Sequence, residues 1–192
     1  MPRTKLPKAA ALPALLLAAS GSLAGAAGRP GHALRPSDLV GAWRLVRIDY
    51  SGPDGPAVDP FYGPAPTGLI VYDASGWMSV QIVSHPRRAW RSHADRRSTS
   101  PTAARGHAAL KAAAYDGYYA YYGAWRIVGG GTAVEHVVSD SLDPAEDGHR
   151  YRQQVRVANG CMTFTNRGGP AGARTTRVKV WARVGAHERC AG

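Results

Sequence analysis

The sequence predicts an all-β fold: an eight-stranded antiparallel up-and-down barrel with one short helix in its central connection. Two observations support this prediction. Eight short segments rich in β-branched and aromatic residues follow one another, most of them joined by tight turns that contain glycine. A single segment of helical composition interrupts them. A closed sheet of this size leaves an interior just wide enough for side chains or one small ligand, and an open β-sandwich is the alternative.

The predicted elements are recognised by alternating apolar residues and by the turn residues between them. The first strand covers residues 40–50, and the proline- and glycine-rich stretch at 51–68 is expected to be a long ordered loop without regular structure. Residues 107–119 favour a helix, and Gly117 falls where that helix would end. The remaining predicted strands are 69–73, 77–83, 119–128, 132–142, 149–157, 161–165 and 174–184.

The N-terminus has the pattern of a secretory signal peptide. Three cationic residues precede an apolar stretch at 9–20, and the small residues at 24–26 fit cleavage before Ala27. The apolar stretch is short and interrupted, so it is poorly suited to a membrane span of about 20 residues. We expect an exported protein, periplasmic or secreted, with no stable membrane span. The expected division is a signal peptide at 1–26, a flexible N-terminal segment at 27–38, a barrel domain at 39–184 and a C-terminal tail at 185–192.

Basic residues outnumber acidic ones. The 24 lysine and arginine residues and 13 aspartate and glutamate residues give a formal net charge of +11, and loss of three cations with the signal peptide leaves about +8 (21 minus 13). The arginines are scattered along the chain, which favours a soluble basic protein; a module that binds anionic surfaces is the alternative. The aromatic residues do not alternate with basic ones in a nucleic-acid-binding pattern, so we expect no nucleic-acid partner.

Two cysteines, Cys161 and Cys190, are present. An even number of cysteines in an exported chain predicts a disulfide, which would connect the start of a late strand to the C-terminal tail. A two-thiol metal or redox site lacks the usual spacing of two residues between the cysteines.

The first predicted strand begins with the sequence GAW, which contains Gly41 and Trp43. This stretch resembles the Gly-x-Trp signature on the first strand of lipocalins. In that superfamily the tryptophan closes one end of the barrel, and an arginine near the end of the last strand packs across its ring. The sequence VWARV supplies Trp181 and Arg183 there, and a guanidinium over an indole gains about 0.5–2 kcal/mol. The resemblance implies structural roles for these four residues.

Five blocks resemble one bacterial and fungal family, the lipocalin-like domain proteins, in their order and spacing across residues 39–184. The blocks are LVGAWRLV, DPFYGPAPTGLIVYDASGWMSVQI, AAAYDGYYAYYGAWRI, EHVVSDSL and VWARV. The signal peptide, the cysteine pair and the arginine-rich central loop depart from the family pattern. Similar barrels bind apolar ligands and a few act as isomerases or cyclases, so the resemblance implies a fold more firmly than a function.

Strand alternation suggests which side chains face the interior. If Trp43 points inward, Leu45, Arg47 and Asp49 point inward as well, because side chains alternate with a period of two. Arg47 is therefore a candidate for binding a ligand carboxylate. The alternative is that the strand twists or ends, so that Arg47 and Asp49 lie at the rim.

His136 is the candidate acid–base residue. It shares a predicted strand face with Val134 and Val138, and it is interpreted either as a general base or as a hydrogen-bonded wall residue. Tyrosines are also dense around the end of the helix and the start of the next strand, where large rings with polar tips suit a ligand cavity. The full set of predicted ligand-binding residues is Arg47, Met78, Val80, Tyr115, Tyr118, Tyr121 and His136.

The sequence thus favours an exported barrel that binds or carries a small, mostly apolar or amphipathic molecule. An isomerase or cyclase that uses acid–base residues in the same cavity is the alternative from another class. The sequence contains no nucleophile elbow, no histidine pair with a recognised metal-ligand spacing and no phosphate-binding loop. We therefore expect no metal or cofactor.

Overall fold

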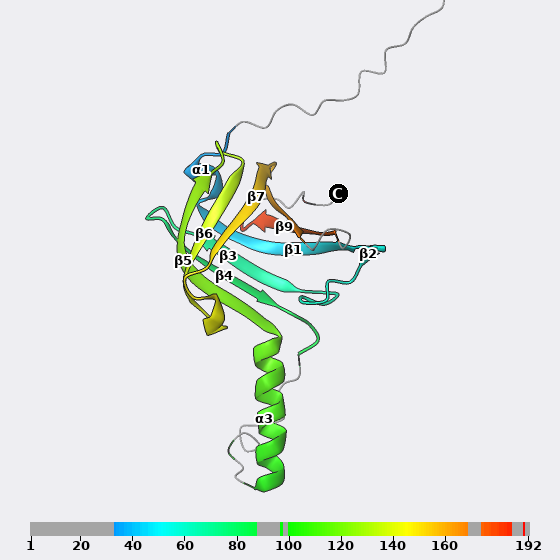
Figure 1. Ribbon diagram of the computed structural model, residues 1–192. Coiled ribbons are helices and arrows are strands. Elements are labelled where there is room, and N and C mark those ends of the chain that lie inside the picture. The colour runs from blue at the N-terminus through cyan, green and yellow to red at the C-terminus, as the bar shows by residue number, and fades with distance from the viewer. Residues whose placement is uncertain (1–32, 88–96, 98–99, 169–173, 186–189, 191–192) are drawn as a thin grey trace, which may run out of the picture. The chain divides into compact units, whose positions relative to one another are not determined.

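The computed structural model describes residues 33–87, 97, 100–168, 174–185 and 190, with the backbone alone at 101–104. The expected signal peptide and residues 27–32 lie outside the described residues. The helices are α1 (Pro36–Leu39), α3 (Pro101–Asp116) and the short 3-10 turn η1 (Pro144–Glu146) (Figure 1). The strands are β1 (Gly41–Gly52), β2 (Gly55–Ala57), β3 (Thr67–Tyr72), β4 (Trp77–Val83), β5 (Tyr118–Val128), β6 (Ala133–Ser141), β7 (Arg150–Ala158), β8 (Cys161–Gly168) and β9 (Thr175–Arg183).

Eight of these strands form a closed antiparallel barrel. Its strand order is β1-β3-β4-β5-β6-β7-β8-β9, and β9 pairs back onto β1, beside which it lies in Figure 1. The predicted fold class is confirmed, and closure by the β1–β9 pair removes the free sheet edges that a sandwich would have. The predicted disulfide is also present, with 5.6 Å between the Cα atoms of Cys161 and Cys190.

Two elements differ from the sequence prediction. The 51–68 stretch contains β2, which forms a short hairpin with the end of β1 through pairs such as Tyr50 with Ala57. The helix α3 begins at Pro101 rather than at residue 107. Proline suits the first turn of a helix because its missing N–H has no partner there, so it marks a start that helix propensity alone did not locate.

A β-bulge in β1 reverses the expected alternation of its second half. Leu45 lies opposite Trp181 and Arg47 lies opposite Val180, so Val46 is an extra residue in this strand. Ile48 therefore faces the interior. The expectation that Arg47 and Asp49 face inward is not met, because strict alternation does not cross a bulge.

Tightly packed side chains fill the end of the barrel near α1. Trp43 donates a hydrogen bond from Nε1 to the carbonyl oxygen of Leu39 at 2.7 Å. The guanidinium carbon of Arg183 lies 4.2 Å from the centre of a Trp43 ring, and its nitrogens donate to the carbonyl oxygens of Val40 and Asp38 at 2.7 and 2.6 Å. We refer to this as the closed end. The largest fully buried side chains include Trp43, Trp181, Tyr72, Phe164, Leu39 and Met162.

The backbone conformation at the first position of the GAW sequence, Gly41, favours a glycine. Its φ is +126°, a conformation that side-chain-bearing residues rarely adopt. A Cβ atom there would also lie 2.9 Å from Nη1 of Arg183. The glycine thus allows the arginine to approach the backbone beside the Trp43 ring.

The pairing of β5 with β6 requires a glycine at Gly123. The register shifts between Tyr122 and Gly123, and a Cβ atom at Gly123 would lie 2.0 Å from the carbonyl oxygen of Val137. We predict that Gly123→Ala lowers the free energy of unfolding by about 2–3 kcal/mol, because the backbone of β6 must move. Urea unfolding measures this change. Gly106→Ala in α3 is the matched control, since its Cβ meets nothing within 4 Å; equal destabilisation by both substitutions would contradict the prediction.

Candidate functional site

The interior has two halves with different packing. The inward-facing residues near the closed end are almost completely buried. Toward the other end, several inward-facing residues are only half-buried. Space for a ligand is therefore expected in this open half rather than behind Trp43. The half-buried residues there are Ile48, Tyr119, Tyr151, Asn166, Arg177 and Lys179.

His136 lies at the centre of the barrel between two tyrosines. Its Nε2 is 2.7 Å from the hydroxyl of Tyr72, and its Nδ1 is 2.7 Å from the hydroxyl of Tyr121. Burial lowers the pKa of His136 to about 3, and the positive charge of Lys179 contributes to this shift. Burial also raises the pKa values of both tyrosines. The three side chains are therefore neutral near pH 7.

This arrangement limits what His136 can do chemically. A neutral imidazole has one donor nitrogen and one acceptor nitrogen, and here each faces a tyrosine hydroxyl. A histidine with a strongly lowered pKa is also a weak base at neutral pH. The geometry thus gives His136 the role of orienting Tyr72 and Tyr121 in the barrel wall.

The segment 59–63 lies against the open half of the interior. Asp59 is only 2% exposed, and its Oδ1 accepts hydrogen bonds from the backbone N–H groups of Phe61 and Tyr62 at 2.9 and 3.0 Å. Arg177 donates to both carboxylate oxygens of Asp59, from Nε at 2.5 Å and from Nη2 at 3.2 Å. Burial alone would raise the pKa of Asp59, but these hydrogen bonds outweigh burial and lower it. The bidentate ion pair therefore attaches the segment to β9.

Aromatic rings surround this ion pair. The Tyr62 ring is buried and makes edge contacts with Phe61 and Tyr119, with ring centres 4.8 and 5.9 Å apart. The Arg177 guanidinium carbon lies 5.2 Å from the centre of the Tyr62 ring and 5.6 Å from that of Tyr50. Rings with polar tips give this half of the barrel both apolar surface and hydrogen-bonding groups.

Lys179 lies beside this cluster on β9. Its Nζ is 5.5 Å from the centre of the Tyr62 ring, and no residue that the structure describes accepts a hydrogen bond from it. Burial of the amine lowers the pKa of Lys179 to about 8, and repulsion from Arg177 adds to this effect. Within the described part of the chain, Oε1 of Gln153 and Oδ1 of Asn166 are also buried without a hydrogen-bond partner. Gln153 as a whole is only 6% exposed.

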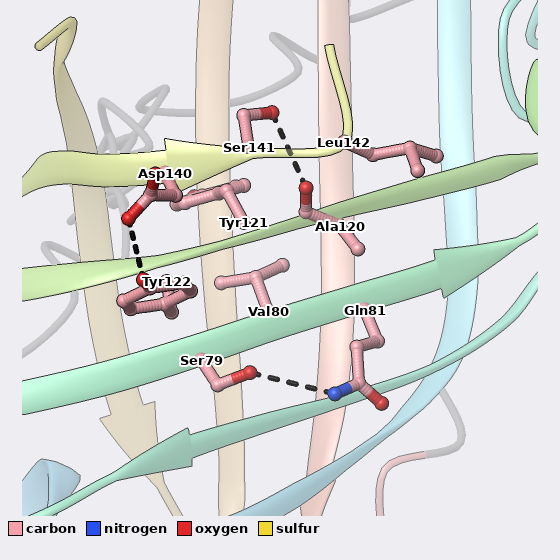
Figure 2. Close-up of a pocket in the computed structure, with 9 residues that line it drawn as sticks. All are labelled: Ser79, Val80, Gln81, Ala120, Tyr121, Tyr122, Asp140, Ser141 and Leu142. Carbon is pink, nitrogen blue, oxygen red and sulfur yellow. Dashed lines mark hydrogen bonds between the residues drawn. The ribbon is translucent and has the colours of Figure 1, made fainter. Parts of the chain in front are cut away.

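A separate groove lies on the outside of the barrel wall, across β4, β5 and β6, as Figure 2 shows. Its volume is about 280 Å³. Tyr122 donates a hydrogen bond to Asp140, and Oγ of Ser141 donates to the carbonyl oxygen of Ala120 at 3.2 Å (Figure 2). These polar groups already have hydrogen-bond partners within the protein. A ligand in the groove would therefore not be needed to satisfy them, unlike a ligand in the interior. The remaining lining residues are Ser79, Val80, Gln81, Tyr121 and Leu142.

The structure brings together only some of the predicted ligand-binding residues. His136 and Tyr121 are in contact, and Met78 and Val80 belong to the same buried core. Tyr115 is 46% exposed on α3.

Tyr118 and Arg47 also lie apart from that group. Tyr118 stacks with Arg87, whose guanidinium carbon is 5.4 Å from the centre of the tyrosine ring. Arg47 lies on the outer face, where it donates hydrogen bonds to Asp49 and to the carbonyl oxygen of Cys190, both at 2.9 Å. Its predicted contact with an interior ligand is therefore replaced by a contact with the C-terminal segment.

Sequence reasoning missed the polar residues of the open half. Strand alternation could have found two of them. Every second residue of the last strand, counted back from Arg183, shares its face, and this series includes Lys179 and Arg177. Asp59 gave no such signal, since it comes from a loop without periodicity. The missed residues are Asp59, Tyr62, Gln153, Asn166, Arg177 and Lys179.

The described residues contain neither a membrane-spanning helix nor a candidate metal cluster. No helix there is long and apolar enough to cross a membrane. No cluster of three or more histidine, cysteine, aspartate or glutamate residues in this part of the chain is arranged to hold a metal ion.

The buried His136 makes stability depend on pH. Because its folded pKa of about 3 lies below the ordinary value of 6.5, the unfolded chain binds a proton first as the pH falls. We predict that the free energy of unfolding decreases below pH 6.5 with a contribution of about 1.4 kcal/mol per pH unit. Chemical unfolding between pH 7 and pH 4.5 measures this slope. His136→Gln removes the contribution, whereas the exposed-site control His149→Gln keeps it; the same slope in all three proteins would contradict the prediction.

Comparison with known proteins bears on the fold as a whole. A family model described as the lipocalin-like domain matches residues 40–184. The comparison with curated proteins gave no match. The match spans the whole barrel, from the residue before β1 to the residue after β9. This chain belongs to the lipocalin-like domain family.

Proposed function

We propose that this protein binds or carries a small amphipathic molecule, largely apolar, in the open half of its barrel. One observation carries the proposal: Oε1 of Gln153 and Oδ1 of Asn166 are buried on the inner face without a hydrogen-bond partner among the described residues. Buried polar groups in folded proteins are nearly always hydrogen-bonded. A ligand with an apolar body and a few polar atoms would supply the missing partners.

The surrounding side chains support an apolar ligand body. Tyr62 and Tyr121 each pack edge to face with Tyr119, with ring centres 5.9 and 5.5 Å apart. Tyr151 adds a fourth ring, whose centre is 5.8 Å from that of Tyr121. Aromatic walls with a few oriented polar groups are typical of small-molecule sites.

Entry would require the 59–63 segment to move. The Asp59–Arg177 ion pair holds this segment in place, and Tyr62 fills space beneath it. Removal of the carboxylate charge would free the segment and leave Arg177 without its partner.

We also propose that the protein is exported, with residues 1–26 removed as a signal peptide. The Cys161–Cys190 disulfide supports an oxidising compartment, because such bonds persist mainly outside the cytosol. The family membership supports a small-molecule-binding fold in general.

Fluorescence titration with the neutral apolar probe phenylnaphthylamine tests the proposed site. We predict saturable binding of one probe per chain, which Asn166→Trp abolishes by filling the open half. Asn166 is a suitable position because its Oδ1 has no partner to lose among the described residues. Ser79→Trp, in the outer groove, is the matched control and should leave binding unchanged. Loss of binding in the control alone would assign the probe to the groove, and absence of saturable binding to the wild type would overturn the proposal.

A second prediction concerns the 59–63 segment. We expect Asp59→Asn to speed association of phenylnaphthylamine in stopped-flow measurements, because the segment opens more often. The free energy of unfolding should also fall by about 3 kcal/mol, since Arg177 loses the partner of a largely buried ion pair. Asp54→Asn, at an exposed position before β2, is the control and should change neither quantity. Unchanged association rates in both variants would show that this segment does not limit entry.

A further inference from the structure

The open half of the barrel contains more positive than negative charge. Arg177 and Lys179 come from the same face of β9, and the carboxylate that acts on both of them is Asp59. Asp59 is already held in a bidentate pair with Arg177. The cluster of Asp59, Arg177 and Lys179 therefore has a net charge of +1 when all three groups are ionised.

Neighbouring acidic residues do not neutralise the remaining charge. Glu146, at the open end, accepts hydrogen bonds from Ser141 and Tyr151. Asp143 caps η1 by accepting a hydrogen bond from the backbone N–H of Ala145. Of the described ionisable groups, those that act on Lys179 are Arg177 and Asp59. Its other neighbours, the Tyr62 ring and the neutral His136, carry no charge near pH 7.

The charge of Lys179 is poorly compensated in the empty barrel. Burial makes the charged form of Lys179 costly, as its pKa of about 8 indicates. The face of the Tyr62 ring offers partial compensation through a cation–π contact, but no hydrogen-bond acceptor. An apolar residue of similar length would fill the same space without this cost. A bound anion would stabilise this charge.

We propose that the ligand of this barrel carries one negatively charged group, an oxyanion such as a carboxylate or sulfonate, that pairs with Lys179 beside Arg177. This inference rests on the proposed ligand-binding function and adds the chemical class of the ligand. The oxyanion accepts hydrogen bonds from Nζ of Lys179, and the apolar body lies against the rings of Tyr62 and Tyr119. The deeper Oε1 of Gln153 accepts a hydrogen bond from a donor at the other end of the ligand.

A matched pair of probes tests the charge requirement. Anilinonaphthalene sulfonate and phenylnaphthylamine share their aromatic body, and only the first carries a negative charge. Both are titrated against the wild type, Lys179→Met and Lys111→Met by fluorescence. Lys111 is an exposed lysine on α3, so its replacement removes the same charge from the surface and controls for long-range attraction.

We expect Lys179→Met to weaken sulfonate binding by about tenfold or more while phenylnaphthylamine binding changes by less than about twofold. Lys111→Met should leave both affinities unchanged. The melting temperature of Lys179→Met should equal or exceed that of the wild type, which also shows that the variant folds. Equal loss of both probes, or loss of neither, would overturn the anionic-ligand proposal alone. Failure of both probes to bind the wild type would overturn the proposed binding function as well.

The wild type provides a test that needs no substitution. The sulfonate group stays charged, so its affinity should fall as the pH rises above about 8 and Lys179 loses its proton. The pKa values of Tyr62 and Tyr119 are raised by burial, so these tyrosines do not titrate in this range. Phenylnaphthylamine affinity should stay constant from pH 7 to pH 9. A flat sulfonate profile across this range would contradict the pairing with Lys179.

Discussion

Closure of the sheet by β1 and β9 determines which side chains share the interior. In a closed barrel every strand sends alternate residues inward, and the register of this last pair determines which residues of β1 and β9 lie opposite each other there. The β-bulge at Val46 changes that register within β1, so that Ile48 rather than Arg47 lies on the inner face. The same pairing aligns Trp43 with Arg183, which fills the closed end.

The polar groups of Trp43 and Arg183 have partners at the closed end, whereas Nε1 of Trp181, Oε1 of Gln153 and Oδ1 of Asn166 are buried without a hydrogen-bond partner among the described residues. The Arg183 guanidinium packs over the Trp43 ring and donates hydrogen bonds to two backbone carbonyl oxygens. Lys179 and Arg177 lie two and three two-residue steps back along β9 from Arg183. One carboxylate, that of Asp59 in the loop after β2, acts on both of them. The largest buried side chains are therefore concentrated at one end, and the poorly compensated charge of Lys179 lies toward the other. Under the proposed function, the closed end has a structural role and the open half receives the ligand.

The sequence was sufficient for the architecture because the signals involved are local. Strand alternation, turn glycines and the Gly-x-Trp block of Gly41 and Trp43 predicted the barrel, and the cysteine pair predicted the disulfide. The candidate site was harder to predict from the sequence. Strict alternation misplaced Arg47, since one extra residue reverses every later position. The Asp59–Arg177 pair joins residues far apart in sequence, so no local pattern could have revealed it.

The most direct test is an NMR titration of the lysine side chains in protein labelled with ¹³C-lysine. Lys179 is expected to lose its proton near pH 8 in the free protein. Addition of anilinonaphthalene sulfonate should raise this midpoint, because a bound anion stabilises the charged ammonium. A Lys179 signal that titrates at the ordinary value of 10.5, with or without the sulfonate, would contradict the account. Such a result would mean that the amine is in water and that the open half holds no uncompensated charge.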